Sequence, residues 1–166
     1  MGILGNSLVT AASFFAMEAV AWAGHKYIMH GLGWSLHRSH HEDHDGWFEI
    51  NDLYGAGFGL LAVATFVWFA PLWPPLYWIA VGVTLYGVAY FVVHDGLVHQ
   101  RWPFHHKPRH PYLKRLVQAH KLHHAVEGRT ECVSFGFLYA PPVRRLKQHL
   151  VRLHAAGRRL RPEPGE

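Results

Sequence analysis

Histidines stand in two sets that have the same internal spacing. Each set has a pair separated by four residues, then a triad in which two adjacent histidines come three and four residues after the first. The members are His25, His30, His37, His40 and His41 in the first set and His94, His99, His120, His123 and His124 in the second. Imidazole is the commonest protein ligand for transition metals. One such pattern would be weak evidence, but its repetition predicts one shared metal site.

The number and type of ligands indicate two metal ions. The only cysteine is Cys132, which excludes an internal disulfide, a four-cysteine zinc site and an all-cysteine iron–sulfur cluster. Any metal must therefore be bound by nitrogen and oxygen. Ten imidazoles exceed the coordination of one ion but suit two ions with about five each. We therefore expect a dinuclear site with room for water or oxygen.

Helix geometry makes different predictions for the triads and the pairs. Residues three and four apart share a helical face, so each triad is expected to bind a metal from one side. Residues five apart are roughly 140° apart at ~3.6 residues per turn. His25 and His30 therefore cannot point to one place from a regular helix. Either the helix is distorted or ends between them, or each pair serves two metals.

The other six of the sixteen histidines lie outside this pattern. The two in the basic C-terminal part are interpreted as membrane-interface anchors, and the three in the Pro-rich segment 101–111 as contacts to a lipid headgroup or a partner. The role of the histidine among the acidic residues 42, 43 and 45 is left undecided. These six are His44, His105, His106, His110, His149 and His154.

Carboxylates accompany the histidines. A metal-bound imidazole usually donates its other N–H to a carboxylate or carbonyl, and the candidates for this role are Glu18, Glu49, Asp52 and Asp95. Glu18 lies seven residues before His25, on nearly the same helical face, and an ionisable group in an apolar helix is a functional candidate. A pair with a lysine, or a protonated core glutamate, is its alternative role. Asp52 and Asp95 are interpreted equally well as interfacial charges.

Long apolar segments must position these residues. The chain has 166 residues, half of them hydrophobic, and residues 53–93 include no Asp, Glu, Lys, Arg or His. Pro71, Pro74 and Pro75 divide this run into helices over 53–70 and 76–93, each about 27 Å long, nearly enough to cross a bilayer. The stretch 3–23 predicts a third membrane helix. We interpret it as retained rather than as a signal peptide, because it has no basic N-terminal region.

Charge then orients the chain. No Lys or Arg occurs from Ser39 to Gln100, and 14 of the 16 follow from Arg101 onward. The positive-inside rule therefore places both histidine-rich segments on the cytoplasmic side of the membrane. The basic residues are expected to face anionic lipid, which disfavours nucleic-acid binding. A fourth apolar stretch, 132–142, is too short to span and is expected at the interface or dipping back among the helices.

The predicted fold is an all-α integral membrane protein with three to four membrane helices and a cytoplasmic, histidine-rich helical cap. It forms a single domain over residues 1–166, with a basic C-terminal tail over 143–166. Ligand type alone does not choose the metal, because zinc suits hydrolysis whereas iron suits oxygen activation. A site at the membrane face favours a lipid-soluble substrate.

Several stretches resemble the membrane di-iron fatty acid hydroxylase and sterol desaturase superfamily, and within it the bacterial β-carotene 3-hydroxylase family. They run from about residue 18 to residue 142 and read HKYIMHGLGW, HRSHH, FEINDLY, FVVHDGLVHQRWPF, YLKRL, AHKLHHAVEG and CVSFGFLYAPP. The resemblance implies two non-haem irons held by the ten patterned histidines, O2 as oxidant and electrons from reduced ferredoxin. It implies no catalytic side chain beyond the metal ligands, and it implies a location in the bacterial inner membrane.

The resemblance also implies hydroxylation of carotenoid β-ionone rings at carbon 3, from β-carotene to β-cryptoxanthin and then zeaxanthin. Canthaxanthin, giving astaxanthin, is a further candidate substrate. Breaking an unactivated C–H bond is beyond acid–base side chains, so the metals must do the chemistry while the protein positions the polyene. A basic surface could steer an acidic ferredoxin toward the protein. Contact with lipid is an equally good role for the same surface. This surface consists of Arg101, Lys107, Arg109, Lys114, Arg115 and Lys121.

Two other classes compete with this interpretation. A hydroxylase or desaturase of fatty acyl or sterol substrates would have the same metal core. A non-enzymatic metal transporter or haem-binding membrane protein would also place histidines near helices. Transport is disfavoured because Glu18 is nearly the only polar ligand within the apolar segments, and because the patterned histidines collect on one side. A purely structural anchor leaves the repeated pattern unexplained.

Overall fold

The computed structural model describes residues 2–42, 46–103 and 105–161, and all regular elements within these ranges are helical. His44 lies outside the described residues. Three segments, η1 to η3, are π-helical, which means that their hydrogen bonds join residues five apart. In chain order the elements are α1 (Ile3–Ala23), η1 (Gly24–Leu32), α2 (Trp34–His41), α3 (Asp52–Ala64), η2 (Thr65–Phe69), α4 (Pro75–Tyr90), η3 (Phe91–Val98), α5 (Pro111–His124) and α6 (Val143–Ala155).

Three continuous helical segments are long and apolar enough to cross a membrane: Ile3–Leu32, Asp52–Phe69 and Pro75–Val98. The predicted division of the apolar run at its prolines is confirmed. Neither α1 nor α3 buries a single side chain within the protein, although both are strongly apolar. Such large apolar surfaces mark contact with lipid or with another protein. The chain is therefore a membrane protein, as its composition predicts.

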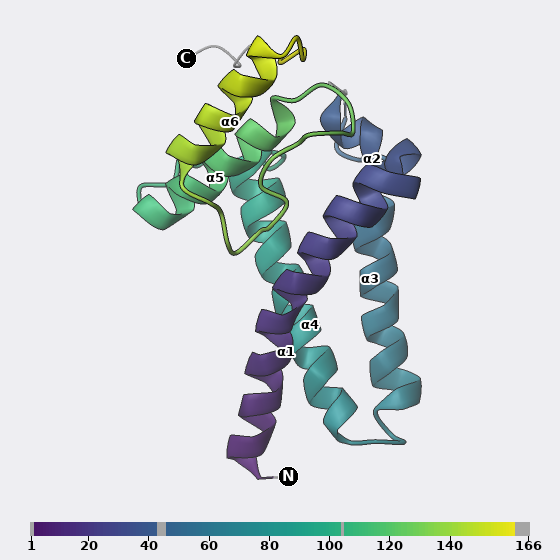
Figure 1. Cartoon of the computed structure of the whole chain (residues 1–166). Coiled ribbons are helices and arrows are strands. Elements are labelled where there is room, and N and C mark those ends of the chain that lie inside the picture. Colours follow the sequence, from purple (N-terminus) through teal and green to yellow (C-terminus); the bar gives the residue numbers. More distant parts are fainter. Residues whose placement is uncertain (1, 43–45, 104, 162–166) are drawn as a thin grey trace.

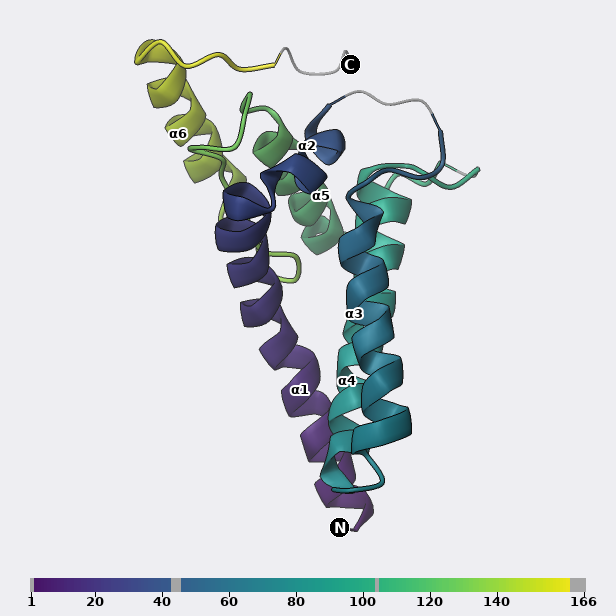
Figure 2. The ribbon, with the colours of Figure 1, turned by 90° about the vertical axis from the view of Figure 1, so that its right-hand side faces the viewer.

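The arrangement of the helices separates a membrane part from a cap (Figures 1 and 2). α1 and α4 pack closely, and α3 lies beside α4. At Gly82 of α4 an added Cβ would lie 2.1 Å from the Ser13 hydroxyl and 2.4 Å from the Thr10 carbonyl, so only glycine permits this approach. α2, α5 and α6 gather at the end of the bundle opposite the N-terminus and the proline turn.

The cap has the hydrophobic core that the membrane helices lack. α5, α6 and the loop between them bury a cluster of apolar side chains. α6 is amphipathic, with Leu146 and Leu150 turned into this core and its basic residues outside. The cluster consists of Leu116, Ala119, Leu122, Val126, Cys132, Val133, Ala140, Leu146 and Leu150. This core fixes α5, which carries the second triad.

The membrane helices run further than the sequence predicts, because π-helical turns continue them into the histidine motifs. The first segment extends through η1 to Leu32, with a kink at Gly31, and the third extends through η3 to Val98. The amide of Gly33 bonds the carbonyl of Ile28 at 2.8 Å, and the amide of His99 bonds that of His94 at 2.9 Å. The histidine pairs are therefore parts of the membrane helices and not of separate cap helices.

Residues 132–142 form a non-helical loop between α5 and α6. From the cap the loop descends beside α1 (Figure 1), and the amides of Phe137 and Leu138 bond the Glu18 carboxylate, about midway along the first apolar segment. This stretch was expected either at the membrane interface or among the helices, and its contacts with Glu18 place it among the helices. Its role in the site is described below.

Candidate metal centre

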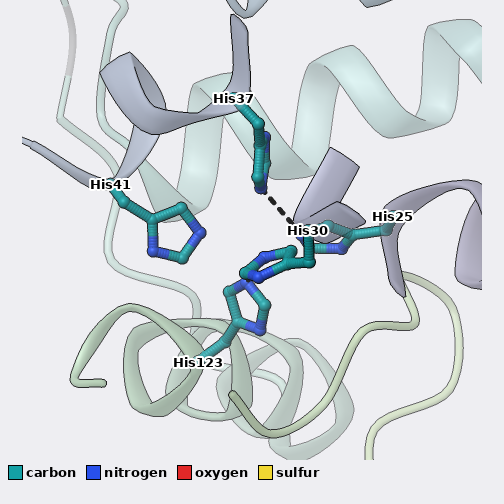
Figure 3. A group of neighbouring side chains, drawn as sticks. All are labelled: His25, His30, His37, His41 and His123. Carbon is teal, nitrogen blue, oxygen red and sulfur yellow. Dashed lines mark hydrogen bonds between the residues drawn. The ribbon is translucent and has the colours of Figure 1, made fainter. Parts of the chain in front are cut away.

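Nine of the ten patterned histidines form two groups that could each hold a metal ion. Within each group, one ring nitrogen from every member lies within 4.8 Å of the others. Figure 3 shows the five rings of the first cluster, which come from η1, α2 and α5 and point toward one another. The first cluster is His25, His30, His37, His41 and His123, and the second cluster is His40, His94, His99 and His120.

The π-helical turns explain how both members of a pair reach one cluster. An i→i+5 hydrogen bond widens the helical turn, so residues five apart fall on the same face. His25 and His30 therefore both belong to the first cluster, and His94 and His99 both belong to the second. Of the two alternatives left by the spacing, the structure shows the distorted helix, and both members of each pair fall in one group.

The triads do the opposite, which corrects the expectation that each of them binds a metal from one side. In α2, His37 and His41 join the first cluster while His40 joins the second. In α5, His123 joins the first cluster and His120 the second. α2 and α5 lie across the two clusters, so residues of one helical face diverge toward neighbouring sites. Sequence spacing gives the shared face but not this division.

His124 lies where the two clusters meet. Its Nε2 is 2.9 Å from the Nε2 of His120, and its ring stacks on that of His41 with centroids 4.3 Å apart. It also contacts the rings of His40 and His99, at 4.8 and 5.0 Å. Three of these four neighbours belong to the second cluster, so His124 would complete five rings around each site.

The first cluster is held from outside by neutral acceptors. His25, His30 and His123 donate from Nδ1 to the backbone carbonyls of Phe135, Arg129 and Val133, at 3.1, 2.9 and 2.8 Å respectively. His37 donates from Nδ1 to the side-chain oxygen of Asn51 at 2.7 Å. Each bond leaves Nε2 facing the interior of the cluster. Two of these carbonyls, from Val133 and Phe135, belong to the loop 132–142.

The second cluster is held from outside by carboxylates. His40 donates from Nδ1 to Glu49 at 2.8 Å, and His94 donates from Nδ1 to Asp95 at 2.9 Å. The guanidinium of Arg101 lies 3.4 Å from Glu49 and 3.5 Å from Asp95, and it binds both oxygens of Asp52 at 2.7 and 2.8 Å. Burial raises the pKa of Glu49 to about 7, and the charge of Arg101 opposes that rise.

The contact between His30 and His123 fits a cation placed between the two rings. Each donates from Nδ1 to a backbone carbonyl, which can only accept, so the neutral ring has an unprotonated Nε2. The two Nε2 atoms nevertheless lie 3.1 Å apart. Facing lone pairs repel at this distance unless positive charge lies between them. Two nitrogens bound to one metal ion at ~2.0–2.1 Å lie about 3 Å apart, so the pair fits a shared ion.

His41 gives independent support. Its ring is 3% exposed, and among the described residues neither of its nitrogens has a hydrogen-bond partner. A buried polar group without a partner costs about 1–3 kcal/mol, which makes such groups rare in folded proteins. A metal ion bound by the first cluster would satisfy one of the two nitrogens.

Burial favours the neutral form of the rings outside the membrane segments. Burial lowers the pKa of His40 and His123 well below the usual value, and neighbouring imidazoles lower it further. Burial lowers the pKa of His37 to about 4, although the bond to Asn51 opposes this. A metal binds the neutral ring, so the fold presents these histidines in the form that coordinates.

The four predicted supporting carboxylates have different roles. Glu49 and Asp95 bond histidine rings directly, as predicted. Asp52 binds Arg101 and is one step removed from the second cluster. The hydrogen bonds of Glu18 within the described residues go to the loop 132–142 and to Tyr86 rather than to a histidine.

Sequence reasoning misplaced Arg101 and missed Asn51. Arg101 was expected on the basic surface, but its side chain is only 15% exposed and lies among three carboxylates. Its position in a Pro-rich basic segment gives no sign of this. The other five residues of that surface, Lys107, Arg109, Lys114, Arg115 and Lys121, are exposed. Asn51 carries no sequence signal beyond its place after Glu49, and backbone acceptors carry none at all.

The described histidines outside the pattern stay outside both clusters. All five are exposed, and no group of possible metal ligands among the described residues includes them. They are His105, His106, His110, His149 and His154. The geometry thus separates these five from the ten patterned rings.

The chain belongs to the fatty acid hydroxylase family, because the model of that family matches residues 10–141. The matched segment contains all ten patterned histidines. Paired imidazole clusters at the end of apolar helices are thus the site of a membrane-bound, metal-dependent hydroxylase.

Among known proteins, a beta-carotene hydroxylase of Paracoccus sp. (strain PC1) is 59% identical over 146 residues, which are 87% of this chain and 90% of the relative. A beta-carotene hydroxylase of Pantoea ananas is 53% identical over 152 residues, or 91% of this chain and 86% of the relative. A chloroplastic beta-carotene 3-hydroxylase of Arabidopsis thaliana is 34% identical over 145 residues, which are 84% of this chain and 46% of the relative. No solved structure matches the chain.

Proposed function

We propose that this chain hydroxylates the β-ionone rings of β-carotene at carbon 3, giving β-cryptoxanthin and then zeaxanthin, with O2 as oxidant. The observation that carries the proposal is the pair of adjoining clusters whose Nε2 atoms face inward, as in the 3.1 Å contact between His30 and His123. The names of the relatives supply the substrate: two proteins that are 59% and 53% identical over most of their length are beta-carotene hydroxylases.

The donor set fits iron. Uncharged imidazole nitrogens, with carboxylates only behind them, bind a redox-active ion such as iron without using thiolates. We assign one iron to the first cluster and one to the second cluster with His124. When bound, the two irons would activate O2 for insertion into an unactivated C–H bond, chemistry that no side chain of the protein supplies.

The protein's own residues orient the metal-binding rings and shield them from water. Outward Nδ1 bonds fix the tautomer and direction of the rings, so each Nε2 is placed before a metal arrives. The rings of His37 and His123 are 2% and 0% exposed, which keeps bulk water from the first cluster. A long apolar substrate would arrive from the bilayer that surrounds the exposed apolar faces of α1 and α3. Only the β-ionone ring of the substrate needs to reach the cap.

The proposed orientation puts the cap in the cytoplasm, where reduced ferredoxin would supply electrons. Five exposed basic residues of the cap, including Lys114 and Arg115, suit an acidic donor. Ferredoxin-dependent turnover should fall steeply as salt rises, while turnover with a small neutral reductant should not. Identical salt responses would contradict this docking surface.

Expression of the chain in cells that accumulate β-carotene tests the function. Pigment extracts should contain 3-hydroxylated products, and His40→Ala and His120→Ala should abolish them because each removes a ring of the second cluster. His110→Ala is the matched control, since His110 is exposed and outside both clusters. Unchanged pigments with confirmed iron-loaded protein would exclude β-carotene and direct the search to fatty acyl or sterol substrates.

A further inference from the structure

We propose that Glu18 is a positioning residue, which holds the loop 132–142 inside the membrane part so that this loop can orient two rings of the first cluster. The inference rests on the proposed metal centre. It differs from the role expected for Glu18 in the sequence, where it was a direct hydrogen-bond partner of a metal-bound histidine.

Glu18 accepts four hydrogen bonds with its two carboxylate oxygens. Oε1 accepts from the amides of Phe137 and Tyr139 at 2.9 and 3.0 Å. Oε2 accepts from the amide of Leu138 and from the hydroxyl of Tyr86 at 2.8 Å each. Three consecutive amides of the loop thus converge on one side chain of α1, and α4 is joined to the same point.

The membrane explains why the loop needs such a partner. Irregular backbone at membrane depth is tolerated only where protein satisfies its polar groups, because lipid offers no hydrogen bonds. The three amides meet Glu18 about midway along the apolar segment Ile3–Leu32. The loop also fits tightly: a Cβ on Gly136 would lie 2.7 Å from the Tyr139 carbonyl and 2.8 Å from Oε1 of Glu18. Only glycine permits this approach.

The same loop reaches the first cluster at its other end. The carbonyl of Val133 accepts from Nδ1 of His123, and that of Phe135 accepts from Nδ1 of His25. The Phe135 ring packs against both imidazoles, with centroids 5.1 and 5.4 Å away. The amides that bind Glu18 follow these two carbonyls closely in the chain, at positions 137–139. The carboxylate therefore fixes the loop, and the loop fixes two rings that come from different helices.

The second cluster is supported from other parts of the chain. The outward acceptors of His40 and His94 are the side chains of Glu49 and Asp95, which lie before α3 and within η3. Loosening the loop should therefore weaken metal binding in the first cluster and leave it unchanged in the second. This selectivity distinguishes a positioning role from general destabilisation, which would affect both clusters together.

Iron binding by purified, detergent-solubilised protein tests the inference. Glu18→Gln keeps the size of the side chain but turns an NH2 group toward one of the donors, and Gly136→Ala pushes the loop away from an intact Glu18. Each variant should lower iron affinity in the first cluster by about 10- to 100-fold, as expected when a supporting shell is lost. Mössbauer spectra should then keep the signal of one iron and lose or alter that of the other.

Thr84→Val is the matched control, because Thr84 lies on α4 and its hydroxyl donates to the carbonyl of Ala80 in its own helix. It should leave both iron signals unchanged. Loss of both signals in equal measure, or two unaltered signals in Glu18→Gln, would overturn the inference. Wild-type protein that binds no iron would instead overturn the proposed function.

A measurement on the metal-free protein gives an independent readout. In Glu18→Gln, the amides of residues 137–139 should exchange with deuterium faster than in wild type, while amides of α5 should not change. Equal exchange at residues 137–139 in both proteins would contradict the role of Glu18 in holding the loop.

Discussion

The first and second clusters differ in what holds them, although each contains one histidine pair with the same five-residue spacing. Rings of the first cluster donate to carbonyls of Arg129, Val133 and Phe135 and to the amide side chain of Asn51, all of which are neutral. Rings of the second cluster donate to the carboxylates of Glu49 and Asp95. One site is supported mainly by backbone and the other by ionisable side chains.

This difference should make the two metals chemically distinct. A carboxylate behind an imidazole raises the basicity of the ring and strengthens its bond to a metal cation, whereas a carbonyl does so less. The second cluster should therefore bind its metal more tightly and stabilise the more oxidised ion. The first cluster should bind more weakly, and its three backbone acceptors remain when the side chains of Arg129, Val133 and Phe135 are substituted.

Removing a ring from either cluster should have the largest effect. His123→Ala should lose the metal of the first cluster and His40→Ala that of the second, because each removes one ring from a single group. Both should lower hydroxylation at least 100-fold, since ligand loss abolishes the shared centre. Metal analysis with pigment extraction checks this. If either substitution released both metals from a folded protein, the two clusters would not be separable sites.

Removing Arg101 should have the next largest effect, which is a loss of protein stability. Arg101→Met leaves Glu49, Asp52 and Asp95 without their shared cation, and breaking such a buried pair should lower the melting temperature by roughly 5–10 °C. Adding Asp52→Asn removes one of the three acidic groups and should restore part of the loss. Thermal unfolding in detergent measures both. An unchanged melting temperature would place Arg101 outside the support of this site.

Neutralising one carboxylate should weaken the second cluster alone. Glu49→Gln keeps an acceptor for His40 but removes its charge, so metal affinity there should fall by about 10- to 100-fold. Competition with a chelator, followed by iron analysis, measures the affinity of each site. The same loss in the first cluster would show that the carboxylates serve both sites.

Adding a carboxylate to the first cluster should have the smallest effect, in the opposite direction. Asn51→Asp would place an anionic acceptor 2.7 Å from Nδ1 of His37 and make this site resemble the second. Metal affinity of the first cluster should rise by a few-fold at most, because only one of its five rings gains charge. A chelator competition curve that is unchanged or weaker would show that charge behind the rings does not set affinity here.

The membrane helices were the most predictable part of the molecule, because an apolar run bounded by prolines leaves few alternatives. The stretch 3–23 and the break near Pro71 were found from composition alone. The ten histidines were identified by their repeated spacing. Their distribution between the clusters was not, because it depends on how α2 and α5 lie in space, which spacing within one helix does not specify.

The remaining features of the site were hidden for different physical reasons. A five-residue spacing fits a π-helical turn or two separate sites, and only the fold decides between them. Arg101 is indistinguishable in sequence from its surface neighbours. The carbonyls of Val133 and Phe135 are present in any sequence, so nothing in the residue types could mark them as partners of His123 and His25.

The wide turn at η1 also absorbs one residue, and so sets the rotational phase between the membrane helix and the cap. Deleting Met29 would change the pair to a four-residue spacing, which an ordinary α-helix accommodates on one face. If the undeleted segment were instead a regular α-helix, everything before it would turn by roughly 100° and shift by ~1.5 Å relative to the cap. Ser13 would then leave Gly82, and Glu18 would leave the loop. The π-helical turn thus allows the same helix to engage its membrane neighbours and its metal site at once.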